Sequence, residues 1–362
     1  MTGERQVRGR TFVVTGGAGF IGSALIRHLI RDFGATVVNV DKLTYASDLR
    51  TLASVTLDPH YRFEHHDIGD RDAMARIFEE HEPDFVINLA AETHVDRSID
   101  DPARFVETNV RGTSVVLEAA RAYWLDLDAQ KREAFRFHHV STDEVFGSLR
   151  SGDDGFNENT PYRPNSPYAA TKAASDFLVR AWHHTYGLPT ILSNCSNNYG
   201  PYQFPEKLIP LTIVRALGEL PLPIYGRGDN VRDWLYVEDH ARALALLATR
   251  ARPGASYNVG GYSERSNLQV VQIICARLDR LRPRTRGSYS DLISFVPDRP
   301  GHDYRYAIDC RAIERDFGFI PTTGFDDGLT RTIHWYLENE EWWRPILSSS
   351  YSGERLGRGP AA

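Results

Sequence analysis

Short apolar runs alternate with stretches of helical periodicity through the first half of the chain. The apolar runs lie at residues 11–15, 36–40, 61–65, 84–89, 135–140 and 189–193. Between them, apolar residues recur at helical spacing over residues 21–31, 71–80, 103–124 and 167–186. Nearly continuous apolar runs are typical of strands covered on both faces. Because strands that alternate with helices predict a parallel sheet, we expect an α/β fold with a Rossmann-type, doubly wound parallel sheet.

The pattern changes after Gly200, where prolines interrupt it at 201, 205, 210, 221 and 223. A later apolar run at 233–237, a helical pattern at 239–249 and a run at 256–259 indicate a return to the sheet. We expect a dinucleotide-binding domain of residues 9–200, completed by residues 232–262. A smaller, interleaved C-terminal substrate-binding domain is expected from residues 201–231 and 263–345. The polar residues 346–362 are expected to form a flexible tail.

The bulk composition argues against several classes of protein. The chain has 362 residues and a net charge of −6, which disfavours a nucleic-acid-binding surface. No run approaches the roughly 20 apolar residues of a membrane span, and the charged N-terminus is unlike a signal peptide. Cys195, Cys275 and Cys310 are far apart and lack metal-ligand spacing, as expected for thiols in a reducing compartment. We therefore expect a cytoplasmic protein without a nucleic-acid or membrane partner.

A glycine-rich turn joins the first predicted strand to the first predicted helix. Gly16, Gly19 and Gly22 have the spacing of a dinucleotide-binding loop, in which glycine permits a tight turn and close approach of a pyrophosphate. The following helix N-terminus offers free N–H groups to the phosphates. Asp41 ends the second strand, where it would accept hydrogen bonds from ribose hydroxyls and repel a 2′-phosphate. The alternative is a merely flexible turn, but the strand before it and the helix after it favour an NAD site.

Tyr168 and Lys172 lie four residues apart in a predicted helix and therefore share one face. This spacing is typical of short-chain dehydrogenases, in which the tyrosine is the general base. A nearby ammonium favours tyrosinate, so we expect Lys172 to lower the pKa of Tyr168 from about 10 toward neutrality. Lys172 would also hold the nicotinamide ribose.

Two adjacent carboxylic acids, Asp143 and Glu144, follow the predicted strand at 135–140. Adjacent carboxylates in a closed pocket separate their pKa values, so that one stays protonated and the other ionises. Such a pair supplies a general acid and a general base, which hydride transfer alone does not need. Thr142, just before them, would orient the hydroxyl that is oxidised. The pattern predicts a second acid–base step joined to redox chemistry, and the alternative is that the pair only caps a turn.

The motifs together resemble the extended short-chain dehydrogenase/reductases, and within them the 4,6-dehydratases that act on dTDP-glucose. The resemblance runs from about residue 10 to residue 343. Besides Tyr168 and Lys172, the segments that carry it are residues 15–22, 89–99, 141–147, 194–210, 232–240 and 298–309. It implies oxidation at sugar carbon 4, with Tyr168 as base, and loss of water across carbons 5 and 6. Glu144 would remove the carbon 5 proton, Asp143 would protonate the leaving hydroxyl, and hydride would return to carbon 6 to give a 4-keto-6-deoxy sugar.

The resemblance and the motifs also imply the residues of two binding sites. The expected cofactor-binding residues are Gly16, Gly19, Phe20, Ile21, Gly22, Asp41, Lys42, Leu43, Thr44, Asp67, Ile68, Leu89, Ala90, Ala91, Thr93, Thr108, Tyr168, Lys172 and Asn198. The expected substrate-binding residues are Thr93, Thr142, Asn197, Lys207, Leu208, Pro223, Ile224, Tyr225, Arg232, Asn267, His302 and Tyr306. In these sites Arg232 would pair with the pyrophosphate, and residues 223–225 would form a wall for the base. Tyr304 stands where the family usually has Arg, which leaves that nucleotide contact open.

Three other functions compete with a dTDP-glucose dehydratase. A UDP-hexose 4-epimerase shares NAD, Tyr168 and Lys172 but has no task for Asp143 and Glu144. Dehydratases of GDP-mannose, CDP-glucose or UDP-N-acetylglucosamine share the carboxylates and differ in the nucleotide pocket. A catalytically inactive scaffold would be expected to lack one or more of these side chains, and all are present.

The resemblance also bears on assembly. The long helices predicted at 103–124 and 167–186 correspond to helices that pair across a two-fold axis in the family, so we expect a homodimer through a four-helix bundle. The adjacent histidines at 65–66, 138–139 and 183–184 do not predict a metal site, because neighbouring strand residues point to opposite faces. The expected product would serve rhamnose and deoxysugar biosynthesis for polysaccharides.

Overall fold

The computed structural model of the chain describes residues 7–349 and residue 356. Its largest element is a seven-stranded sheet with all strands parallel, in the order β10-β6-β5-β4-β1-β2-β3. The strands are β1 (Thr11–Thr15), β2 (Thr36–Val40), β3 (Tyr61–Glu64), β4 (Phe85–Asn88), β5 (Arg136–Thr142), β6 (Thr190–Cys195) and β10 (Ser256–Val259). The expected Rossmann-type, doubly wound sheet is confirmed. The strand order reverses between β1 and β4, which is where such sheets bind ligands at their carboxyl ends.

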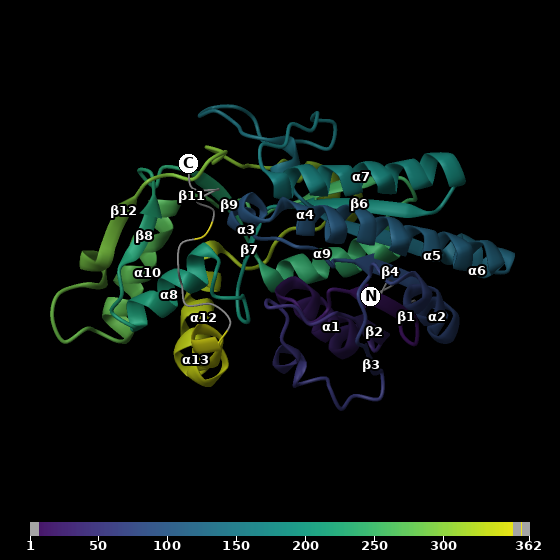
Figure 1. Ribbon diagram of the computed structural model, residues 1–362, viewed down its shortest axis with the longest axis horizontal. Coiled ribbons are helices and arrows are strands. Elements are labelled where there is room, and N and C mark those ends of the chain that lie inside the picture. Colours follow the sequence, from purple (N-terminus) through teal and green to yellow (C-terminus); the bar gives the residue numbers. More distant parts are fainter. Residues whose placement is uncertain (1–6, 350–355, 357–362) are drawn as a thin grey trace.

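Helices cover both faces of this sheet (Figure 1). One face carries α1 (Phe20–Phe33) and α9 (Val237–Arg250), which pack together in one apolar cluster. The other face carries α2 (Arg71–His81), α5 (Thr113–Asp126) and α7 (Pro167–Tyr186). The limits of α7 follow from its sequence, because Ser166 caps the N–H of Ala169 and Gly187 ends the helix at φ 75°.

The helix expected at residues 103–124 is not a single α-helix. The chain forms α4 (Pro102–Phe105), a π-helical segment η3 (Val106–Gly112) and then α5. In addition to these, the first lobe contains the shorter helices η2 (Leu49–Leu52), α3 (Val95–Asp100), α6 (Ala129–Ala134) and η4 (Asp143–Phe146). The wider turn of η3 carries Asn109, whose side chain bonds both backbone groups of Glu92 and the hydroxyl of Thr171. These long-range bonds connect Glu92, in the loop after β4, to Thr171 on α7. The π-helical segment η3 therefore lies beside the candidate site.

The second lobe is built from later segments and lies at one end of the large sheet (Figure 1). Its small sheets contain β7 (Asn197–Tyr199), β9 (Val231–Tyr236) and β11 (Glu264–Ser266), and separately β8 (Leu222–Tyr225) and β12 (Ile293–Val296). Its helices are α8 (Leu208–Leu217), α10 (Asn267–Leu281), η5 (Tyr289–Leu292), α12 (Phe325–Glu338) and α13 (Glu340–Ser349). Their apolar faces form one core around Tyr199, Ile213 and Tyr336.

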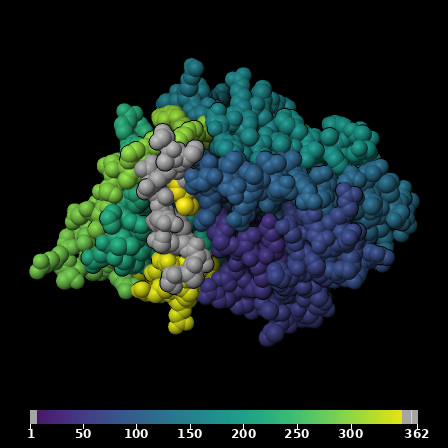
Figure 2. Space-filling model, viewed as in Figure 1, coloured from purple at the N-terminus to yellow at the C-terminus, as the bar shows by residue number. Residues whose placement is uncertain are grey.

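Two of the expected boundaries differ from the structure. Helix α11 (Arg311–Phe317), which we assigned to the second domain, packs on β10 of the large sheet and places Ile313 in the cluster with Val259. Residues 346–349, which we assigned to the tail, form the end of α13. The rest of the predicted tail, apart from residue 356, lies outside the described residues. Figure 2 shows α13, in yellow, beside purple residues of the first lobe, and Arg50 donates to the carbonyl of Trp342 at 3.2 Å.

Acidification is expected to weaken this fold through two buried histidines. Burial lowers the pKa of His138 and of His240 to about 3, against 6.5 for an exposed imidazole. Between these values the unfolded chain binds more protons than the folded chain, so the free energy of unfolding falls as pH falls. The loss is about 2 kcal/mol per histidine between about pH 6.5 and pH 5. Chemical denaturation at the two pH values measures it, and a His138→Asn variant should show a shallower dependence.

Candidate active site

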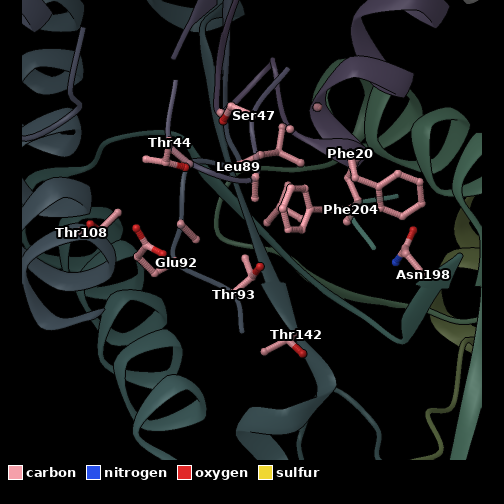
Figure 3. Close-up of a pocket in the computed structure, with 18 of the residues that line it drawn as sticks. Phe20, Thr44, Ser47, Leu89, Glu92, Thr93, Thr108, Thr142, Asn198 and Phe204 are labelled. Carbon is pink, nitrogen blue, oxygen red and sulfur yellow. The ribbon is translucent and has the colours of Figure 1, made fainter. Parts of the chain in front are cut away.

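A cavity opens at the carboxyl ends of β1, β4 and β5, where the strand order reverses. Figure 3 shows Phe20, Leu89 and Phe204 at one part of it and Thr93 and Thr142 further along. Every expected cofactor-binding residue lines this cavity except Leu43 and Asp67. Asp67 instead pairs with Lys42 at 3.2 Å and accepts from the N–H of Gly69, as an ordinary loop aspartate does. The amide of Leu43 donates to Asp41, so its contribution is to hold that carboxylate.

The glycine-rich turn fits a dinucleotide pyrophosphate. Gly16 has φ +69°, and a Cβ there would lie 2.8 Å from the N and Cα of Ala90. A Cβ on Gly22 would lie 2.3 Å from the carbonyl oxygen of Gly16. Helix α1 begins behind Gly19 without a side-chain cap, so its first N–H groups are available to phosphate oxygens. Asp41 accepts from the N–H of Ala18 at 3.0 Å and keeps further lone pairs for ribose hydroxyls.

A Gly16→Ala substitution is expected to destabilise the protein and weaken NAD binding. The methyl group would meet the backbone of Ala90 and would also sit at a positive φ, which costs about 1–3 kcal/mol before any clash is counted. The matched control is Gly318→Ala, at φ +66° with nothing within 4 Å of the added Cβ. Thermal unfolding and NAD titration should show a larger loss for Gly16→Ala. Equal losses in the two variants would contradict the close approach.

Tyr168 and Thr142 meet at the base of the cavity. Thr142 ends β5, its side chain lies with that of Tyr168 in the lining of the cavity, and Tyr168 is 8% exposed. The amide of Tyr168 donates to the hydroxyl of Ser98, and its ring packs edge-on against Phe105. These contacts hold the phenol at the cavity wall beside the strand end. The expected pairing of Thr142 and Tyr168 on one reacting hydroxyl therefore has the required proximity.

The expectation that Lys172 lowers the pKa of Tyr168 is not met. Burial, followed by the charge of Glu144, raises the pKa of Tyr168 well above 10. Lys172 is itself buried, and its ammonium donates to the carbonyl of Val140 at 2.9 Å, with Nε2 of His139 3.3 Å away. The spacing of the two residues could show that they share a helix face. It could not show that desolvation and a carboxylate outweigh the ammonium.

The two carboxylates have different surroundings. Asp143 is 1% exposed, and burial, Glu144 and Asp233 together raise its pKa well above 3.8. Burial also raises the pKa of Glu144, but the charges of three cations oppose it, namely Arg299, Arg232 and Lys207. The electrostatics therefore favour a protonated Asp143 and a more readily ionised Glu144. This order of ionisation is compatible with the acid and base roles that the resemblance implies for the two residues.

The expected substrate residues fall into two groups. Thr93, Thr142, Asn197 and Lys207 line the cavity, and the Nζ of Lys207 donates to the carbonyl of Thr93. The others do not line it, and these are Leu208, Pro223, Ile224, Tyr225, Arg232, Asn267, His302 and Tyr306. Leu208 packs on the core of the second lobe, and Ile224 is 1% exposed within it, so the Ile224 side chain cannot form the wall of a base pocket. That expectation is wrong for its side chain, because β8 turns it inward.

The remaining members of the second group gather around buried charges. The Arg232 guanidinium lies 4.2 Å from the Tyr306 ring centroid and donates to the carbonyl of Asp303. The Tyr225 and His302 rings stand edge-to-face at 6.2 Å. Asn267 begins α10, and its amide donates to Asn230.

Sequence reasoning missed a pair that links the lobes. Asp96 on α3 accepts from Arg299 at 2.7 Å and from the hydroxyl of Tyr225 at 2.9 Å. Arg299 is also the largest charge that lowers the pKa of Glu144. Both Asp96 and Arg299 lie inside the segments 89–99 and 298–309 that carried the resemblance. The signal was therefore present, but nothing in the sequence showed that the two segments meet.

Two structural checks bear on the expected absence of metal and membrane partners. Among the described residues, the one trio with ligand atoms close enough for a metal ion is Glu64, Glu80 and His81. Arg76 forms ion pairs with both of these carboxylates, at 2.9 and 2.6 Å. None of the helices in the described part of the chain has the length and apolar character of a membrane span.

Comparison with known proteins gives a consistent result. The model of the GDP-mannose 4,6 dehydratase family matches residues 13–332. A dTDP-glucose 4,6-dehydratase of Neisseria meningitidis serogroup B is 56% identical, over 97% of this chain and 99% of the relative. Among solved structures, the dTDP-glucose 4,6-dehydratase DesIV of Streptomyces venezuelae, with NAD and TYD bound, matches with a TM-score of 0.84 at 45% identity. It covers 93% of this chain and 99% of that one.

An enzyme of different activity shares the fold at greater distance. The UDP-glucose 4-epimerase of Thermus thermophilus, in complex with NAD, has a TM-score of 0.79 at 28% identity and covers 91% of this chain and 99% of that one. The fold alone therefore does not separate dehydration from epimerisation.

Proposed function

We infer that this chain, which belongs to the 4,6-dehydratase family of the extended short-chain dehydrogenase/reductases, is an NAD-dependent dTDP-glucose 4,6-dehydratase. The observation that carries this conclusion is the buried Asp143 beside the partly buried Glu144, in one cavity with Tyr168 and Lys172. An epimerase needs only the last two side chains. The chain also has the glycine turn and the Asp41 carboxylate that NAD requires.

The proposed reaction makes no net use of oxidant. Bound NAD⁺ supplies the redox chemistry, accepting hydride from sugar carbon 4 and returning it to carbon 6. Tyr168 takes the proton of the carbon 4 hydroxyl, which Thr142 helps to orient. The new ketone acidifies carbon 5, where Glu144 removes the proton, and Asp143 protonates the carbon 6 hydroxyl so that it leaves as water. When hydride reaches carbon 6, Glu144 returns its proton to carbon 5, giving the 4-keto-6-deoxy sugar nucleotide.

The charges around Glu144 support its role as the base. Arg299, Arg232 and Lys207 stabilise its carboxylate, and the same three cations suit the pyrophosphate of a sugar nucleotide. We propose that the substrate extends from Thr142 and Thr93 toward the second lobe. In that lobe the aromatic rings of Tyr225 and His302 lie near the position that we expect for the nucleoside. Residues 201–231 and 263–310 form most of this proposed substrate-binding domain.

Turnover of sugar nucleotides tests the proposed function. Purified protein is incubated with dTDP-glucose, and separately with UDP-glucose and GDP-mannose, while product mass and the alkaline absorbance of a 4-keto sugar are followed. The expected product is lighter than dTDP-glucose by one water, and the other substrates should react far more slowly. A product of unchanged mass with inverted carbon 4 would identify a 4-epimerase. A dehydrated product from GDP-mannose or UDP-glucose alone would show that the enzyme is specific for GDP or UDP and not for dTDP.

We propose that the enzyme is a homodimer through a four-helix bundle of α5 and α7 with their symmetry mates. These helices pack together, and apolar side chains stand exposed along them and η3, with Val106 49% and Phe177 57% exposed. A second copy would bury that surface. Light scattering should give twice the chain mass of 40.9 kDa, and Phe177→Arg should lower it, whereas Phe295→Arg on β12 should not. A wild-type monomer would contradict the dimer.

A cytoplasmic location is supported by the cysteines. Cys195, Cys275 and Cys310 are buried free thiols, which is typical of proteins in a reducing compartment. Fractionation of cells with an antibody against the chain would test it.

A further inference from the structure

The side of Lys172 away from the cavity meets a buried polar cluster that the reaction scheme does not use. His139 on β5 is 1% exposed, and Asp176, one turn after Lys172 on α7, is 0% exposed. Neither residue lines the cavity. His139 belongs to one of the histidine pairs that have no metal role, and Asp176 lies outside every motif identified in the sequence. Both nevertheless lie directly behind the ammonium group of the catalytic lysine.

A chain of hydrogen bonds determines where the proton of His139 lies. The N–H of Ala90 donates to the Thr15 hydroxyl at 3.2 Å, so that hydroxyl donates its own proton to Oδ1 of Asn88 at 2.6 Å. The side-chain nitrogen of Asn88 must then face His139, and it donates to Nδ1 of His139 at 3.0 Å. Because Nδ1 accepts, the neutral imidazole carries its proton on Nε2.

That Nε2–H group stands between a cation and an anion. Nε2 lies 3.3 Å from Nζ of Lys172 and 3.5 Å from Oδ1 of Asp176. An N–H group cannot accept from an ammonium, so with Lys172 charged it points to Oδ1 of Asp176. Apart from this 3.5 Å contact with Nε2, that oxygen has no hydrogen-bond partner among the described residues. The other oxygen, Oδ2, accepts from Ser141 at 2.8 Å and Tyr162 at 2.9 Å, which holds the carboxylate in place.

We propose that His139 and Asp176 are positioning residues for the dehydratase reaction, in which Asp176 is the buried counter-ion that keeps Lys172 an ammonium and the Nε2–H group of His139 holds the Asp176 carboxylate in place. This inference rests on the proposed function, because it assigns a role to Lys172 in turnover. Lys172 lies one helical turn from Tyr168 on α7 and lines the same cavity. Its positive charge makes a tyrosinate at Tyr168 less unfavourable than it would be beside a neutral amine, although burial still keeps the pKa of Tyr168 above 10. A neutral amine could donate a hydrogen bond but could not supply that charge.

The electrostatics of the cluster agree with the geometry. Burial lowers the pKa of Lys172, and Asp176 is the largest charge that opposes this change. Burial raises the pKa of Asp176 to about 6, so that its carboxylate is ionised at neutral pH. The other titratable or charged groups around the pair, from α7 and the strands and loops packed on it, are Arg180, Tyr162, His139, His138 and Cys195. Of these, His139 is held neutral by burial and by Lys172, which lower its pKa well below 6.5.

The first test is Asp176→Asn in the full-length protein with bound NAD. Loss of the anion lowers the pKa of Lys172, so the ammonium is lost at a lower pH and the alkaline limb of the kcat profile moves down. A shift of one pH unit or more is expected, with at least a tenfold loss of kcat on that limb. The KM for dTDP-glucose should change less than twofold, because Asp176 does not reach the cavity. Bound NAD, released and quantified, should stay at the wild-type level.

A second set of variants distinguishes a positioning role of His139 from a purely structural one. His139→Gln keeps an N–H group near the position of Nε2, whereas His139→Asn is too short to do so. His139→Gln should therefore keep kcat within about threefold of wild type, and His139→Asn should reproduce the shift of Asp176→Asn. His138→Asn is the matched control, because His138 is equally buried on the same strand but faces Ser193 on the opposite side. It should keep the wild-type pH profile.

The outcomes are distinguishable. If wild-type protein does not dehydrate dTDP-glucose, the proposed function fails. If wild type is active and both Asp176→Asn and His139→Asn keep its pH profile, the inference fails. It also fails if His138→Asn loses as much activity as His139→Asn, or if the loss follows lost NAD. If circular dichroism shows that Asp176→Asn does not fold, the two His139 variants test the inference instead. It then fails if His139→Gln and His139→Asn have the same pH profile.

Discussion

Tyr168→Phe is expected to lower kcat for dTDP-glucose by about 10²–10⁴-fold, the range typical of removing a general base. The phenol is the group positioned with Thr142 for the carbon 4 hydroxyl, and phenylalanine keeps the ring contact with Phe105 but cannot take a proton. Fold and bound NAD should be retained, because the change removes one oxygen. Steady-state kinetics, with the NAD content of the same preparation, measures both.

The pH profile makes this test sharper. Burial and Glu144 raise the pKa of Tyr168, so its proton-accepting form grows as pH rises, and wild-type activity should rise with it. The Tyr168→Phe variant should lack this ascending limb. Tyr257→Phe is the control, since the Tyr257 hydroxyl donates to Asp316 far from the cavity. Wild-type turnover by Tyr168→Phe would show that another group accepts the hydroxyl proton.

Glu144→Gln and Asp143→Asn are expected to stop the reaction at different points, each with a loss of dehydration of about 10²–10⁴-fold. Glu144→Gln removes the base for carbon 5, so no hydrogen should leave that carbon. Asp143→Asn removes the acid for the carbon 6 hydroxyl but leaves Glu144, with its three neighbouring cations, able to take the carbon 5 proton. Oxidation at carbon 4 should remain possible in both variants.

Heavy water distinguishes the two variants. dTDP-glucose recovered from Asp143→Asn should carry deuterium at carbon 5, and dTDP-glucose recovered from Glu144→Gln should not, as read by mass spectrometry and proton NMR. Glu158→Gln is the control, because Glu158 is a partly buried carboxylate outside the cavity that accepts from the backbone N–H of Asn258. The reverse pattern would exchange the two roles. Full activity in both variants would mean that the pair only caps the turn η4.

The candidate site could be predicted from the sequence wherever its signal is local. The glycine spacing at 16–22 reflects the positions of Gly16 and Gly22, where a Cβ would collide with backbone atoms, and the interval from Tyr168 to Lys172 is one helical turn. The adjacent acids Asp143 and Glu144 indicate acid–base chemistry, because burying two carboxylates at the end of a strand costs free energy unless they have a function. The residues that the sequence predicts for the cofactor lie together in one cavity, with Leu43 and Asp67 as the exceptions.

The substrate side was harder to predict because it depends on which segments meet. Asp96 and Arg299 are 203 residues apart and form an ion pair only because the second lobe folds back onto α3. Ile224 turns inward because one face of β8 packs on α8 and the core of the second lobe, which comes from segments distant in sequence. The π-helical turn at Val106–Gly112 is stabilised by bonds from Asn109 to Glu92 and Thr171, which are also distant in sequence.

The sequence by itself determined the alternation of strands and helices, the glycine-rich turn and which side chains we propose to react. These depend on backbone geometry and residue spacing within one or two turns of chain. Only the tertiary structure decided how those side chains are charged. Burial raises the pKa of Tyr168, whereas the neighbouring lysine predicted a decrease. Cations from three distant segments oppose the increase in the pKa of Glu144, which makes Glu144 easier to ionise than Asp143. It also set His139 and Asp176 behind Lys172, because desolvation and long-range charge exist only once the segments have packed together.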